Sequence, residues 1–325
     1  MIPISVVMPV YNTPVPILKE AIDSILNQSF RDFEFIIIDD GSQGETAVYL
    51  DTLDDSRIRL LRNKTNIGIT KSLNIGFRAA QGKYIARMDA DDISLKERLE
   101  KQYAYMESHP DVVLCGCAVE EFGTKKGQYF TVIKDPEFYK IKCLFYYPGP
   151  VHPTFFIRKQ VLDQHNISYN EELIYVQDYG LLVDISAATG ARIFNLPEVL
   201  LKRRNHEIRI TVQHQETQKL CKLKTQRKLL RKLLVNVTEE EVNLHYQYFY
   251  DKNLRGFKDF CRCFQWCIKL SKANHQLKQY SIFKFDLYVF KLFMLVTGQS
   301  FMPKLAAPLL SWRNKILIKQ YRNRQ

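Results

Sequence analysis

Short apolar runs alternate with amphipathic stretches along the first 90 residues. Runs typical of buried strands occur at Ile4–Pro9, Phe33–Ile38, Ile58–Leu61 and Tyr84–Met88. Between them the apolar spacing predicts one helix opened by Pro14 and Pro16, a short polar helix, and a third helix that Thr70 caps. This alternation predicts βαβ units and a parallel sheet with helices on both faces.

The pattern changes after about residue 110. Strands are predicted at Val112–Leu114, Gln128–Ile133 and Leu196–Lys202, and helices at Lys159–His165 and Asp178–Thr189. From about residue 213 onward the chain is predicted to be mainly helical. We therefore predict an α/β domain over residues 1–215, with a Rossmann-like, mixed but mostly parallel sheet, and a helical tail over residues 216–325.

Positive charge is concentrated in the predicted tail. The formal net charge is +12, yet residues 219–325 alone hold 22 Lys and Arg against 6 Asp and Glu. Such a tract favours an anionic partner: phosphates, lipid head groups or nucleic acid. Aromatic residues are interleaved with these cations, which favours a membrane-surface anchor over a helical bundle or oligomer contact, with nucleic acid least favoured. The sequence does not predict the oligomeric state.

No targeting segment or membrane span is predicted. Residues 1–5 lack a basic region and lead directly into a strand. The longest apolar stretch, Ile282–Val296, is interrupted by Lys284, Asp286 and Lys291. Seven cysteines in a chain of this length fit a reducing compartment. We expect a cytoplasmic protein that is peripheral on the inner face of the plasma membrane.

Acidic side chains gather where predicted strands end. Asp39 and Asp40 follow the second strand, and Asp89, Asp91 and Asp92 follow the fourth. Because ligands bind at the carboxyl ends of parallel strands, these groups are expected at one edge of the sheet. Crowded carboxylates repel one another unless a cation neutralises them, and Mg²⁺ or Mn²⁺ with a nucleotide diphosphate suits such a site. A single aspartate there would more simply be a turn or cap residue.

Several ordered motifs resemble glycosyltransferase family 2. They are Val6–Asn12, Ala21–Phe30, Phe33–Ser42, Asn66–Gly68 with Leu73–Gly76, and Ala80–Asp92. The resemblance covers residues 3 to about 210. It implies a GT-A fold, a nucleotide-sugar donor that is usually UDP-linked, a divalent metal, and inversion at the anomeric carbon. It also implies work on a bacterial surface polysaccharide such as lipopolysaccharide or capsule.

The resemblance assigns contacts to the donor residue by residue. The residues that it implies for nucleotide-sugar binding are Pro9, Val10, Tyr11, Asn12, Asp40, Lys71, Asp89, Ala90 and Asp91. Tyr11 would lie against the base and Asp40 would hydrogen-bond it. Asp89 matches the first Asp of the Asp-x-Asp motif, near the ribose, and Asp91 matches the metal-bridging Asp. Lys71 would reach a phosphate or the base.

Inverting transfer also needs a base for the acceptor hydroxyl and a Lewis acid for the departing diphosphate. The family's base lies in a Glu-Asp pair at a helix start, and here Gln177 and Asp178 occupy that place. Asp178 is the expected base, with a plain helix cap as the alternative, and Gln177 replaces the Glu beside the acceptor. His152 is expected at the donor sugar or acceptor, or as a structural residue. His206 is a candidate metal ligand, or a solvated residue of a basic loop.

Together these features predict an enzyme that moves a sugar from a nucleotide donor to a glycan or polyprenyl-diphosphate-linked acceptor, with Mn²⁺ or Mg²⁺ as cofactor. One alternative is a sugar-phosphate nucleotidyltransferase, which would show a Gly-rich basic loop where this chain has residues 9–14. Another is a non-catalytic protein that binds a membrane or nucleic acid through its basic tail. The donor sugar, linkage and acceptor are not predicted.

Overall fold

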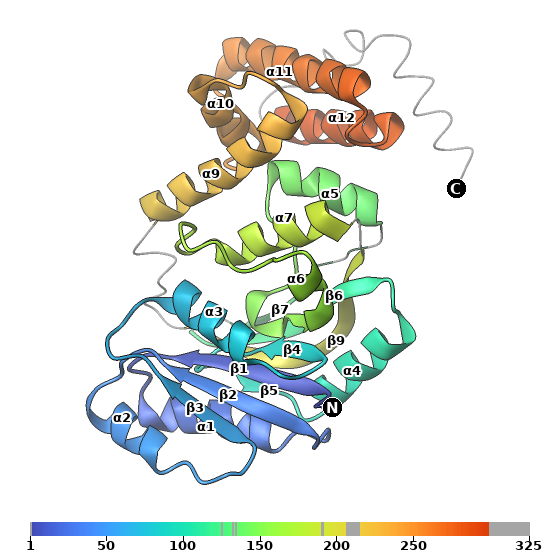
Figure 1. Ribbon diagram of the computed structural model, residues 1–325. Coiled ribbons are helices and arrows are strands. Elements are labelled where there is room, and N and C mark those ends of the chain that lie inside the picture. The colour runs from blue at the N-terminus through green and yellow to red at the C-terminus, as the bar shows by residue number, and fades with distance from the viewer. Residues whose placement is uncertain are drawn as a thin grey trace. The chain divides into compact units, whose positions relative to one another are not determined.

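The computed structural model describes residues 2–124, 126–131, 133, 135–189, 192–205 and 215–298 (Figure 1). The chain divides into two compact units, residues 1–136 with 149–221 and residues 137–148 with 222–325. A short internal segment therefore belongs with the second unit. The assignment of residues 1–215 and 216–325 to a catalytic domain and a tail remains a prediction.

The first unit combines one sheet with helices on its faces. Its strands are β1 Ile4–Val10, β2 Phe33–Asp39, β3 Ile58–Arg62, β4 Tyr84–Arg87, β5 Ile93–Ser94, β6 Val112–Gly123, β7 Gly127–Tyr129, β8 Phe156–Arg158 and β9 Arg192–Asn205. Its helices are α1 Val15–Leu26, α2 Gly44–Asp51, α3 Ile69–Ala79, α4 Arg98–Ser108, the 3₁₀ turn η1 His152–Thr154, α6 Lys159–Gln164 and α7 Gln177–Thr189.

The sheet has the order β3-β2-β1-β4-β8-β6-β9-β5, with β7 paired to β6. The strands β3, β2, β1 and β4 are mutually parallel, whereas β8 is antiparallel to both of its neighbours. The predicted mixed, mostly parallel sheet is confirmed. Because β1 lies between β2 and β4, the carboxyl ends of these three strands meet at one edge, as the sequence predicted.

Alternate residues of the central strand face opposite helical layers. Val6 and Met8 of β1 belong to the buried core that includes Ile22 of α1. Val7 faces the other way, against α3, where a Cβ added at Gly76 would lie 2.5 Å from Val7 Cγ1. Helices therefore cover both faces, and a glycine sets how closely α3 approaches the sheet.

Three local expectations were wrong. Thr70 does not cap α3, because the helix begins after Gly68, whose φ of 92° favours glycine. The N–H of Gly68 donates to the Asp40 carboxylate. The strands β6 and β9 are much longer than predicted, because they pair with each other well beyond their apolar segments. The predicted strand at 128–133 is shorter, since β7 ends at Tyr129.

The second unit is helical. Its helices are α5 Pro136–Phe145, α9 Gln215–Leu233, which begins in the first unit, α10 Glu239–Phe249, α11 Gly256–Leu277 and α12 Ile282–Gly298. A capping box starts α10: the Thr238 hydroxyl accepts from Glu241 N–H at 3.2 Å, and the Glu241 carboxylate accepts from Thr238 N–H at 3.1 Å. The helical character predicted for this region is confirmed over the described residues.

A buried histidine links three helices of the second unit. His245 Nδ1 accepts a hydrogen bond from the Trp266 indole at 3.1 Å, so the ring is neutral and its Nε2–H donates to the Leu144 carbonyl at 2.9 Å. Burial lowers the pKa of His245 to about 4. This residue ties α5 to α10 and α11 as a structural group.

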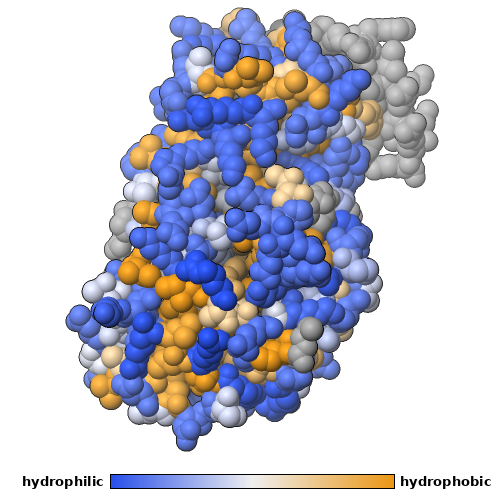
Figure 2. Space-filling view, viewed as in Figure 1, coloured by the Kyte–Doolittle hydropathy of each residue, from blue (hydrophilic) through white to orange (hydrophobic). Residues whose placement is uncertain are grey.

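Among residues 215–298, no helix is both long and apolar enough to cross a bilayer, and the same holds for the rest of the described chain. Hydrophobic side chains show among hydrophilic ones over α10 and α11 (Figure 2). The predicted membrane-surface role stays a prediction, and its aromatic residues beyond 298, including Trp312 and Tyr321, lie outside the described residues.

Candidate active site

The carboxylate of Asp40 holds the loop that leads into α3. It is 2% exposed, and its Oδ1 accepts from Asn63 Nδ2 at 2.8 Å and Ile67 N–H at 3.0 Å, while its Oδ2 accepts from Gly68 N–H at 2.9 Å. At Gly41, with φ of 78°, an added Cβ would lie 2.7 Å from the Thr65 carbonyl carbon. Asp40 therefore shapes the loop, and its predicted contact with a base stays a prediction.

The end of β1 exposes one aromatic ring. Pro9 and Val10 are buried in the strand, whereas Tyr11 directly after it is 50% exposed. Asn12 has a left-handed backbone (φ 47°) and donates its N–H to Ser42 Oγ at 3.0 Å, which joins the loops after β1 and β2. Of the four residues predicted here, Tyr11 offers the side chain most available to a ligand. Lys71 is likewise exposed, in the first turn of α3.

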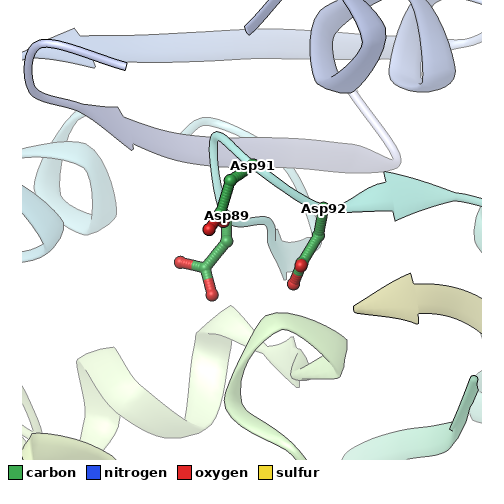
Figure 3. A group of neighbouring side chains, drawn as sticks. All are labelled: Asp89, Asp91 and Asp92. Carbon is green, nitrogen blue, oxygen red and sulfur yellow. The ribbon is translucent and has the colours of Figure 1, made fainter. Parts of the chain in front are cut away.

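Three carboxylates converge in the loop between β4 and β5. Asp89, Asp91 and Asp92 each offer an oxygen, and these atoms lie within 4.8 Å of one another. Their carboxyl groups point to the same side of the loop (Figure 3). Ala90 between them is buried. Oxygen donors at this spacing suit a hard divalent cation, so the predicted convergence at this strand end is observed.

A buried arginine faces this acidic cluster. Arg87, the last residue of β4, is 2% exposed and donates from one terminal nitrogen to Asp89 Oδ2 at 2.7 Å, while the other pairs with Oδ1. Burial raises the pKa of Asp89, and the Arg87 cation opposes that rise. Arg98 of α4, fully buried, donates to the Arg87 carbonyl at 2.6 Å and so fixes the end of the strand.

Asp92 joins the acidic loop to β9. Its Oδ1 accepts from Arg204 N–H at 2.8 Å, and Arg204 Nε donates to the Asp91 carbonyl at 3.0 Å. The other oxygen, Oδ2, is buried with no hydrogen-bond partner in the described part of the chain. Burial, together with Asp89 and Asp91, raises the pKa of Asp92 well above its usual range. An unpartnered buried oxygen beside two more carboxylates fits a cation site.

Behind the acidic loop lies a hydrogen-bonded chain from α3 to η1. Asn74 binds both backbone groups of Tyr169: its Nδ2 donates to the carbonyl at 2.9 Å and its Oδ1 accepts from the N–H at 3.0 Å. The Tyr169 hydroxyl contacts His152 Nε2 at 2.7 Å. Burial and the Arg87 cation lower the pKa of His152 well below its usual range, so this residue is neutral at pH 7.

Asp178 lies in the first turn of α7, behind Gln177. Its Oδ1 accepts from the N–H of Tyr179 at 2.8 Å, and its side chain is half-buried. Burial raises the pKa of Tyr169, Arg87 lowers it, and both Asp178 and Asp89 raise it further. Both carboxylates therefore lie within electrostatic range of one phenol. The side-chain oxygen of Gln177 is buried with no partner in the described residues.

The structure thus brings Asp89, Asp91 and Asp92 together, and His152 contacts Tyr169, whose phenol lies within electrostatic range of Asp89 and Asp178. His206 lies outside the described residues. Arg87, Arg98 and Tyr169 were not among the site residues predicted from the sequence. The position of Arg87 could have been predicted, because it is two residues before Asp89 and that spacing in an extended strand puts both side chains on one face.

Comparison with known proteins agrees with this geometry. The family model for glycosyl transferase family 2 matches residues 5–166. An "Uncharacterized glycosyltransferase" of Haemophilus influenzae is 35% identical over 216 residues, covering 62% of this chain and 65% of the relative. The amylovoran biosynthesis glycosyltransferase AmsE of Erwinia amylovora is 32% identical over 208 residues, covering 62% of this chain and 75% of the relative.

The fold is shared with a solved structure. S. aureus TarS 1-349, in complex with UDP-GlcNAc, superposes with a TM-score of 0.58 at 17% identity, over 87% of this chain and 89% of that chain. The architecture is therefore the GT-A fold. With the sequence matches above, the chain belongs to glycosyl transferase family 2.

Proposed function

We propose that this chain is an inverting, metal-dependent glycosyltransferase that moves a sugar from a UDP-linked donor to a hydroxyl group of a glycan or lipid-linked acceptor. The observation that carries the proposal is the carboxylate cluster after β4, which lies beside Arg87. Asp178 and Asp89 of this cluster are both within electrostatic range of the buried Tyr169. Family membership and the UDP-GlcNAc complex of the structural relative support the donor class.

In the proposed reaction Asp178 takes the proton of the acceptor hydroxyl. The acceptor oxygen then forms a bond to the anomeric carbon from the face opposite the leaving group, the bond from that carbon to the diphosphate oxygen breaks, and UDP departs with the electron pair. The neutral His152, whose Nε2 contacts the Tyr169 hydroxyl, would hydrogen-bond a sugar hydroxyl without adding charge. Half-burial of Asp178 limits competing water.

The residues present fit a divalent metal, because Asp92 Oδ2 is a buried acceptor without a partner in the described chain and two more carboxylates lie beside it. Asp89, Asp91 and Asp92 would hold Mn²⁺ or Mg²⁺, and Asp91 is the proposed bridge to the donor. When bound, the ion would supply Lewis-acid stabilisation of the leaving diphosphate. Tyr11 would stack on the base, and Lys71 would contact a phosphate.

The acceptor belongs to a surface polysaccharide in this proposal, which the name of the E. amylovora relative supports. The excess of Lys and Arg in residues 219–325 would bring the protein to the anionic inner face of the plasma membrane. Flotation with anionic and with neutral vesicles tests this part separately from the chemistry.

The deciding experiment is a panel of UDP-sugars with Mn²⁺ or Mg²⁺, followed by UDP release and by NMR of the anomeric product. Asp178→Asn is expected to keep donor binding and to lose transfer, because the amide cannot take the proton. Asp184→Asn, six residues further along α7, is the matched control and should keep both. Full turnover by Asp178→Asn would remove Asp178 as the base, and no response to any nucleotide sugar would overturn the function.

A further inference from the structure

The second unit contains a pocket that the proposed sugar transfer does not use. Its volume is about 470 Å³, within the range of ordinary ligand sites. It lies among α5, the turn after α10 and α12. Its lining residues are Lys142, Tyr146, Tyr147, Phe249, Tyr250, Lys252, Tyr288, Lys291, Leu292 and Leu295. Among the residues that the structure describes, the lining thus contains three lysines and no carboxylate.

The three lysines are gathered without acidic partners. No ion pair or hydrogen bond joins the side chains of Lys142, Lys252 or Lys291 to another residue of the described chain. Burial and the nearby Lys291 lower the pKa of Lys142. The dipole at the carboxyl end of a helix stabilises a cation at Lys142, at the end of α5, and at Lys252, after α10. Lys291 lies in the middle of α12, where no helix-end dipole acts. Like charges converging on one cavity are stabilised by a bound anion.

The remaining wall is aromatic and apolar. Tyr288, Leu292 and Leu295 lie with Lys291 on one face of α12, at spacings of three and four residues. The Tyr288 hydroxyl donates to that of Tyr146 at 3.0 Å, so the hydroxyl groups of two lining tyrosines bond to each other. This wall suits the hydrocarbon portion of a ligand whose charged end meets the lysines.

Hydrogen bonds tie the end of α5, beside the pocket, to α9 and α10. The Leu144 and Phe145 carbonyls at the end of α5 accept from His245 at 2.9 Å and from Gln226 at 2.8 Å. The turn at Lys252 has a left-handed backbone, with φ of 52°. Preformed walls of this kind reduce the ordering cost of binding.

We propose that this pocket binds an organic phosphate or diphosphate: the anionic group contacts Lys142, Lys252 and Lys291, and an apolar stem lies against Tyr288, Leu292 and Leu295. The same chemistry is found in a free amphiphilic phosphate and in the head group of an anionic lipid. Its lining residues belong to the second unit and the Asp89 cluster belongs to the first, so the proposal stands whether or not sugar transfer is confirmed.

The test is titration calorimetry of the full chain with farnesyl diphosphate, in EDTA so that no metal-dependent nucleotide site contributes. We expect Lys142→Gln and Lys291→Gln each to weaken binding about tenfold, the size of one lost charge-assisted contact. Leu295→Glu, at a side chain that is 41% exposed, should weaken it similarly by adding a carboxylate at the mouth. Lys272→Gln, on the exposed surface of α11, is the control and should bind like the unaltered protein.

Further arms identify the source of the phosphate. Inorganic diphosphate should bind at least about tenfold more weakly than farnesyl diphosphate, since it lacks the stem; equal affinity would overturn the proposal. If vesicles with phosphatidic acid bind the protein and binding depends on Lys142 and Lys291, the ligand is a membrane lipid. If farnesyl diphosphate binds and these vesicles do not, the ligand is a free compound. Lysine-independent binding, or no binding of either probe, would overturn the site. Mn²⁺-dependent UDP binding by the same variants should be unchanged.

Discussion

Replacing Arg87 with methionine tests whether the acidic cluster depends on a built-in cation. The substitution keeps an unbranched apolar stem in place of the aliphatic part of Arg87 but removes the guanidinium and both of its contacts to Asp89. Breaking a buried ion pair by removing one partner costs about 3–5 kcal/mol. The Asp89 side chain is 29% exposed, so solvent offsets part of that loss, and we expect the free energy of unfolding to fall by about 2–3 kcal/mol.

For a unit of this size, that loss corresponds to a fall in Tm of about 5–10 °C. The assay is thermal unfolding of the two single variants Arg87→Met and Asp89→Asn and of the double variant. In the double variant the uncompensated charge is gone, so we expect a coupling free energy of about 1–3 kcal/mol. Arg59→Met is the matched control: Arg59 is 45% exposed, its distance of 3.9 Å to Glu34 is long for an ion pair, and it also donates one hydrogen bond to the Ala79 carbonyl at 3.0 Å. It should change stability by less than about 1 kcal/mol.

Metal provides the second readout. If Asp89, Asp91 and Asp92 share a cation site, Mn²⁺ should raise the Tm of Arg87→Met more than that of the unaltered protein, because the ion replaces the missing positive charge. A Tm of Arg87→Met equal to that of the control variant, or a double variant no more stable than the sum of the singles predicts, would refute the reasoning.

Three further substitutions test other parts of the structure. Asp92→Asn should raise the Tm without metal, because repulsion among three carboxylates is relieved, and should shrink the Tm rise caused by Mn²⁺. Gly41→Ala should lower the Tm and weaken UDP binding more than Gly44→Ala, since both have positive φ but only Gly41 has backbone atoms where the new Cβ would lie. Burial lowers the pKa of His245 to about 4, whereas a histidine of the unfolded chain has a pKa of about 6.5, so the unfolded chain takes up the proton first as the pH falls. The free energy of unfolding is therefore unaffected by His245 above about pH 6.5 and falls by about 3 kcal/mol by the time the pH reaches 4. Urea unfolding of His245→Phe from pH 7 to pH 4 should lack this slope, whereas exposed His165→Phe should keep it.

Elements with a strong local signal were predictable from the sequence. The strands β1, β2 and β4 are mostly apolar, so their positions and the meeting of their carboxyl ends followed from the pattern alone. The long pairing of β6 with β9 was not predictable, because its polar half is held by partners far away in the sequence, such as Glu121 with Arg203. The start of α3 was missed because Asp40, 28 residues before Gly68, determines where that helix begins.

The candidate site also has a part that the sequence predicts and a part that it does not. Its carboxylates are local and adjacent in the sequence, whereas the groups that set their charge state come from separate elements. Arg87 neutralises Asp89 from within β4, and Arg204 of β9 fixes Asp92 through a backbone bond that adds no charge to that carboxylate. Arg87 therefore sets the charge that Asp89 presents to a cation, and Asp92 Oδ2, which has no hydrogen-bond partner in the described chain, is a further acceptor for that cation. Altering Arg87 should then change metal affinity, and altering the Asp92 contact should change the shape of the site.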